Sequence, residues 1–153
     1  MERNKEIIET LNDLVQINND RIAGYENAIK ETKDDGELVS VFNNKILESQ
    51  QFKSTLAREI QVLGSDVDND TSVSGTIHRT WLEIKATFTG HSEKSILEEC
   101  EFGEDAIKKA YQSALNRHLP AYIRDILNDQ QAILQQSHDE IKALRDSVHH
   151  QHH

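Results

Sequence analysis

Apolar residues recur every three or four positions through four long stretches of this chain, and this periodicity constrains the fold more than any other feature. The long stretches cover residues 3–32, 36–63, 93–118 and 120–147, and a shorter stretch with the same period covers residues 75–89. Each stretch is predicted to form an amphipathic helix, whose apolar side must be buried against other helices. The pattern therefore predicts an all-α protein.

Residues that interrupt helices stand mainly between the periodic stretches. Asp35 is a predicted N-cap for the second long helix, and Gly64 suits the position just after its end. Pro120 cannot continue the preceding helix, but it fits the first turn of the next one. The chain has one proline and six glycines, and only 5% of its residues are aromatic. This composition favours helices over sheets.

The lengths of the connections predict how the helices are arranged. Short turns join the first long helix to the second and the third to the fourth, so each pair should form an antiparallel hairpin. The connection from residue 64 to residue 92 carries the short helix and is long enough to cross the whole bundle. Two hairpins joined by one long crossover make a ferritin-like four-helix bundle. We expect residues 1–148 to form this single domain and the His-rich tail, residues 149–153, to be disordered.

The charge and the single cysteine limit the partners and the compartment. Seventeen basic and 27 acidic residues give the chain a net charge of −10. A surface this negative repels nucleic acids and anionic membranes, so neither is an expected partner. One cysteine, Cys100, allows no intrachain disulfide, and no apolar run is long enough for a membrane span or a signal peptide. We expect a cytoplasmic protein.

Polar residues interrupt each long apolar stripe near its middle and predict a buried polar layer, because each would be costly there without a partner. The interruptions, in chain order, are Asn18, Glu48, Ser49, Glu101, Glu104, Gln135 and His138. Di-metal bundles build their centre at such a level, from single glutamates and two Glu-x-x-His pairs. The spacing of each pair places both ligands on one face of a helix, directed at one metal.

The two matching pairs in this chain are incomplete. Glu48-x-x-Gln51 lacks the histidine, and Gln135-x-x-His138 lacks the glutamate. An amide is a poor ligand for Fe²⁺ or Mn²⁺. The candidate metal ligands that remain are Glu48, Glu101, Glu104 and His138.

Two interpretations of the layer stay open. In the preferred one, Asn18, Gln51 and Gln135 belong to a satisfied hydrogen-bond network that fixes the register of the helices, and no cofactor is expected. In the other, the candidate ligands form a reduced site for iron or manganese.

Three residues of the predicted short helix, His78, Arg79 and Trp81, are a separate candidate patch. They could bind a small anionic ligand or a partner in a pocket between the crossover and the bundle. Alternatively, Trp81 packs the crossover onto the bundle while Arg79 pairs with a carboxylate. A lone tryptophan in a small domain usually anchors packing, so the second interpretation is preferred.

Several longer strings together resemble a bacterial family, domain of unknown function 2383. The strings are LNDLVQINNDRIAGYENA, GTIHRTWLEIK, EFGEDAIKKAYQSAL and LPAYIRDIL, and HDEIKALRD near the end also fits. The resemblance covers nearly the whole chain and implies a ferritin-like four-helix bundle. It implies no activity and no catalytic residues. We therefore expect a non-enzymatic protein that acts by self-association, as a homodimer, or by binding another protein, with the metal protein as the alternative.

Overall fold

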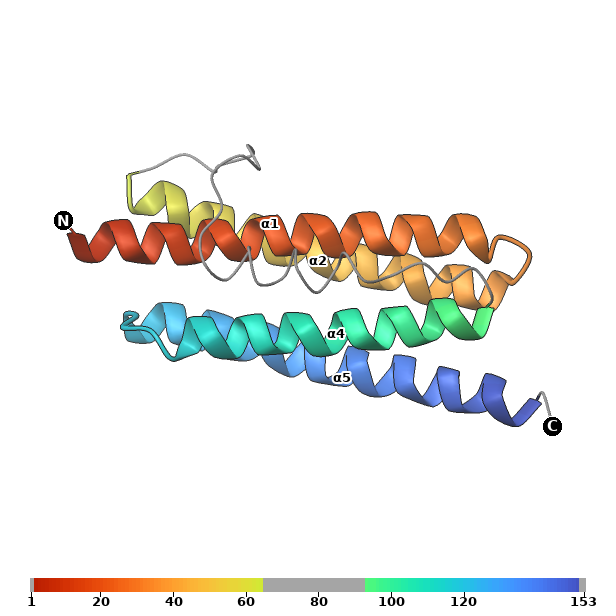
Figure 1. Cartoon of the computed structure of the whole chain (residues 1–153). Coiled ribbons are helices and arrows are strands. Elements are labelled where there is room, and N and C mark those ends of the chain that lie inside the picture. Colours follow the sequence, from red (N-terminus) through yellow and green to blue (C-terminus); the bar gives the residue numbers. More distant parts are fainter. Residues whose placement is uncertain (1, 65–92, 152–153) are drawn as a thin grey trace.

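The computed structural model describes residues 2–64 and 93–151. They form the helices α1 (Glu2–Glu31), α2 (Gly36–Val62), α4 (Glu93–Leu115) and α5 (Ala121–Gln151) (Figure 1). These residues contain no strand, and the predicted all-α four-helix bundle is confirmed. The short helix predicted at residues 75–89 lies outside the described residues.

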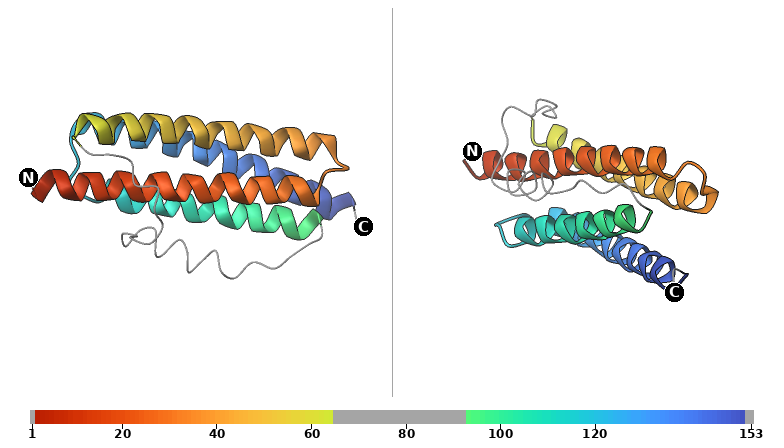
Figure 2. Two further views of the ribbon diagram at one scale, coloured as in Figure 1. Left: turned by 90° about the horizontal axis from the view of Figure 1, so that it is seen from above. Right: turned by 45° about the vertical axis from the view of Figure 1, so that its right-hand side comes forward.

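The four helices form two antiparallel hairpins stacked on each other. α1 packs against α2 and α4 packs against α5, while α1 also packs against α4. A hydrogen bond between side chains of α2 and α5 completes the ring of neighbours, with α2 along one edge of the bundle (Figure 2). α2 ends and α4 begins at opposite ends of the bundle (Figure 1), as predicted for two hairpins joined by one long connection.

The caps predicted for α2 are confirmed. The side chain of Asp35 accepts a hydrogen bond from the backbone N–H of Leu38 at 3.2 Å. Gly64 follows the helix with φ of 86°, in the left-handed region that favours glycine.

Two helix ends lie more than one residue from their predicted positions. α4 ends at Leu115 and not at residue 118, because a proline disfavours helical geometry in the residue before it and residues 116–120 form the turn. α5 continues to Gln151, into the tail that was predicted to be disordered. No glycine or proline follows Pro120, so nothing in the sequence stops this helix earlier.

The apolar core consists of two clusters. The larger lies toward the end of the bundle with the α4–α5 turn and includes Leu14, Leu56, Ile107 and Leu127. The smaller lies toward the α1–α2 turn and includes Phe42, Leu97 and Ile141. Burying each such side chain stabilises the fold by roughly 1.5–3 kcal/mol. The two clusters hold the helices on both sides of a polar layer.

Candidate functional site

The polar layer is centred on Arg21, a residue of α1 whose side chain is only 3% exposed. Its Nε donates to Glu104 Oε1 at 2.9 Å, and its Nη2 donates to Glu104 Oε2 at 3.3 Å. Nη2 also donates to Glu48 Oε1 at 3.1 Å. The Glu104 side chain is 1% exposed and that of Glu48 is 29% exposed. The guanidinium therefore holds a buried carboxylate of α4 in a two-pronged, charge-assisted contact.

The other guanidinium contacts reach the two remaining helices. Nη1 donates to Ser49 Oγ at 2.9 Å and to the backbone carbonyl of Lys45 at 3.1 Å, both on α2. Nη2 donates to Ser137 Oγ of α5 at 2.9 Å. A guanidinium has five N–H donors, and acceptors surround all three of its nitrogens here. A single side chain thus bonds α1 to all three other helices.

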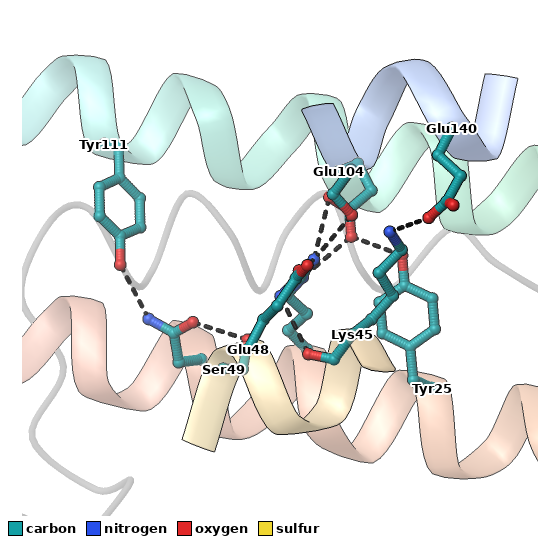
Figure 3. Close-up of polar contacts among 10 residues, drawn as sticks. Tyr25, Lys45, Glu48, Ser49, Glu104, Tyr111 and Glu140 are labelled. Atoms are coloured by element: carbon teal, nitrogen blue, oxygen red, sulfur yellow. Dashed lines mark hydrogen bonds and ion pairs between the residues drawn. The ribbon is translucent and has the colours of Figure 1, made fainter. Parts of the chain in front are cut away.

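Charged partners keep Arg21 ionised in spite of its burial. Burial alone would lower the pKa of the guanidinium, but the charge of Glu104, its hydrogen bond and the charge of Glu48 outweigh burial and raise that pKa above its ordinary value. The Tyr25 ring centroid lies 5.4 Å from the guanidinium carbon, and its hydroxyl donates to Glu104 (Figure 3). Burial, followed by the charge of Glu104, raises the pKa of Tyr25 well above its ordinary value.

A chain of hydrogen bonds leads from the layer into the larger apolar cluster. Ser49 Oγ donates to Asn18 Oδ1 at 2.8 Å, and Asn18 Nδ2 donates to the Tyr111 hydroxyl at 3.1 Å (Figure 3). Tyr111 in turn donates to Gln130 Oε1 at 2.6 Å, and Gln130 Nε2 donates to the carbonyl of Phe52 at 3.4 Å. Each polar side chain in this series of hydrogen bonds therefore has a partner, as a stable core requires.

A second ion pair joins the two hairpins beside the layer. The ammonium of Lys45, on a side chain only 4% exposed, pairs with Glu140 of α5 (Figure 3). Glu140 itself is 52% exposed, so solvent screens this pair more than the Arg21–Glu104 pair. Lys45 therefore bonds α2 to α5 at the surface end of the layer.

The family comparison covers most of this site. A family of undefined role, domain of unknown function 2383 (DUF2383), matches residues 6–117. The chain belongs to this family. The matched range contains most of α1 and all of α2 and α4 and stops before α5, so it includes Arg21, Glu48 and Glu104 but not Ser137. No curated protein matches the chain.

None of the described helices of this DUF2383 protein is long and apolar enough to cross a membrane.

The four candidate metal ligands lie in two separate places. Glu48 and Glu104 lie together in the layer, where both bind Arg21. Glu101 instead pairs with Arg145, and His138 Nε2 lies 3.9 Å from Glu101 Oε1. The histidine thus belongs to a group between α4 and α5 and not to the layer.

A di-metal centre does not fit the donors of the layer. Its two carboxylates already share the positive charge of Arg21, which repels a metal ion, and no imidazole of the described helices pairs with them. Across residues 2–64 and 93–151, no group of three His, Cys, Asp or Glu side chains could hold a metal ion.

Only one of the three amides predicted for the polar layer lies in it. Asn18 is fully buried there, but Gln51 and Gln135 are exposed. On α2 the core-facing positions are Ser49 and Phe52, so Gln51 turns outward. Gln135 likewise lies on the outer side of α5, where its amide donates to Asp139 at 3.0 Å. The predicted patch of His78, Arg79 and Trp81 lies outside the described residues.

The sequence pattern did not single out Arg21 or Lys45, although both make ion pairs between helices in or beside the layer. A usable signal exists for Arg21. It falls between Asn18 and Tyr25 at helical spacing, on the side of α1 that faces the core. A cation at a core position, with glutamates predicted at the same level of other helices, indicates a buried ion pair.

A double-mutant cycle measures the pair between Arg21 and Glu104. Arg21→Met leaves Glu104 buried without a cation and should lower the free energy of unfolding by about 3–5 kcal/mol. Arg21→Met/Glu104→Met removes both charges and should restore most of that loss. Urea unfolding of the wild type, both single variants and the double variant gives the coupling. Lys142→Met, at an exposed lysine of α5 outside the layer, is the control. A stable Arg21→Met protein would contradict this account.

Tyr25 and Tyr111 should make the fold sensitive to alkali. Burial raises the pKa of both phenols, so the folded state retains protons that the unfolded state loses above an ordinary pKa of about 10. The free energy of unfolding should therefore fall as the pH rises above about 10, and these two groups should not affect it at lower pH. In a Tyr122→Phe background, which removes the exposed third tyrosine, tyrosinate absorbance should appear together with loss of helical circular dichroism. Ionisation of both phenols near pH 10 in an intact fold would oppose this prediction.

Proposed function

We propose that this protein is a non-enzymatic, ferritin-like helical bundle that acts by binding protein chains, and that its polar layer is structural. The observation that supports the proposal is that the Arg21 side chain is buried and fully paired. Its guanidinium lies between Glu48 and Glu104, at a level where di-metal bundles carry their cations. A metal centre that performs chemistry keeps a position open for water or substrate, whereas the guanidinium is surrounded by protein acceptors.

The outer surface supports an interaction role. Large apolar side chains are exposed on α2, α4 and α5, and the most exposed of them are Leu47 and Val62 on α2. Apolar groups exposed on an otherwise charged protein are typical of surfaces that meet other chains. In this proposal the core holds α2 in place and the outer face of α2 makes the contacts.

One observation favours the second proposal, a protein that binds iron or manganese. His138 Nε2 lies 3.9 Å from Glu101 Oε1 and 4.0 Å from Asp105 Oδ1, so three ligand types lie near one another between α4 and α5, although as placed they do not form a group that could hold a metal ion. Metal–ligand bonds are roughly 2 Å long, so these side chains would have to turn toward an ion.

Elemental analysis separates the two proposals. The protein should be produced in medium with added iron and manganese, with the four tail histidines (residues 149, 150, 152 and 153) replaced by alanine. We expect far less than one metal ion per chain, and the same low content in Glu104→Gln and His138→Ala. Stoichiometric metal that His138→Ala abolishes would instead establish the metal protein. Loss of metal in Glu104→Gln alone would place it in the layer.

A further inference from the structure

The outward side of α2 is unusual because it carries no charge over four turns. Between residues 40 and 54 every exposed residue is neutral, although 29% of the chain is charged. Leu47, at the centre of this side, is 61% exposed. The six other exposed residues of this stretch, which we call the α2 face together with Leu47, are Ser40, Asn43, Asn44, Gln50, Gln51 and Ser54.

The charged residues of the same stretch point elsewhere. Lys45 is buried and pairs with Glu140, and Glu48 binds Arg21 in the layer. Lys53 is only partly exposed, on the flank of the helix. The polar layer thus draws two charges of α2 inward and leaves the α2 face neutral.

The order of residues along the α2 face is symmetric about Leu47. Three positions on either side of it stand the amides Asn44 and Gln50, and four positions on either side stand the amides Asn43 and Gln51. Seven positions away, on either side, stand the hydroxyls of Ser40 and Ser54. Steps of three, four and seven residues keep all of these positions on one face of a helix.

From this symmetry we infer that the α2 face binds a second copy of this chain, with the two α2 helices antiparallel and a two-fold axis at Leu47. In a two-fold interface, residue i of one copy meets residue j of the other, and j meets i. The axis at Leu47 sets Leu47 against itself, each asparagine against a glutamine and each Ser40 against a Ser54. Carboxamides both donate and accept hydrogen bonds, so the facing pairs are complementary.

Charge argues for a second copy as the occupant and for the antiparallel direction. Two copies that each carry −10 repel each other wherever acidic surfaces meet, and the α2 face removes that repulsion locally. At the ends of this face, Glu37 and Arg58 are both exposed. The antiparallel arrangement places Glu37 of each copy near Arg58 of the other, whereas a parallel arrangement would place like charges together.

The inference rests on the proposed interaction role, and the full-length chain tests it. Sedimentation velocity over a range of protein concentrations should show a monomer–dimer equilibrium. Leu47→Glu places two carboxylates at the axis and should weaken the dimer by roughly tenfold or more. The control Phe102→Glu changes another exposed apolar residue, on α4, and should leave the equilibrium unchanged. Circular dichroism should show the same helical content in all three proteins.

Disulfide cross-linking tests the direction of the two helices. In a Cys100→Ser background, a mixture of Ser40→Cys and Ser54→Cys proteins should form a cross-linked dimer on mild oxidation. Either protein alone should not, because a disulfide needs Cα atoms within roughly 7 Å. Self-cross-linking of the single variants without cross-linking of the mixture would overturn the antiparallel arrangement.

The outcomes also distinguish this inference from the function on which it rests. A monomer at every concentration overturns the inference. A dimer that Leu47→Glu leaves intact shows that the α2 face is not the dimer interface, but it is still consistent with the interaction role. Stoichiometric bound metal would count against the proposed interaction role, but it would not bear on whether two copies pair through the α2 face.

Discussion

The buried charge of Arg21 is the constraint on which the rest of this bundle depends. A guanidinium removed from water is costly unless its charge is paired and its donors are satisfied. The acceptors come from Glu104 on α4, Ser137 on α5, and Ser49 and Glu48 on α2. A shift of any helix by one residue would break several of these bonds at once. The layer therefore specifies the register of the four helices, while the two apolar clusters supply most of the stability.

The layer also connects the core to the surface. A metal ion between carboxylates can hold several helices together and still exchange ligands, whereas a guanidinium fixes its partners and performs no chemistry at that position. The same contacts turn Glu48 and Lys45 toward the interior of the bundle. The residues that remain exposed on α2 between positions 40 and 54 are neutral and symmetric about Leu47. The proposed interaction role of this DUF2383 protein thus follows from where its core places charge.

The sequence predicted the helices and the level of the polar layer, because periodicity and caps are local signals. It also predicted Asn18, Glu48 and Glu104 as members of the layer. It misplaced Gln51, three positions after the partly buried Glu48, and Gln135, three positions before the partly buried His138. A residue at such spacing from a partly buried one can still turn away from the core. Arg21 was missed because a search for metal ligands looks for acids and histidines. Which carboxylate meets which cation depends on packing between helices, and no single stretch of sequence contains that information.

Chemical rescue of Arg21→Ala tests the central role of the guanidinium most directly. Ethylguanidinium, which matches the atoms that the substitution removes, can enter the space left by the side chain at low millimolar concentration and bind the same acceptors. The thermal midpoint of Arg21→Ala should rise with ethylguanidinium concentration, as for any ligand that binds the folded state. The wild type and Arg21→Ala/Glu104→Gln should show no such rise. An Arg21→Ala protein that responds no more than the wild type would contradict the view that this buried cation organises the bundle.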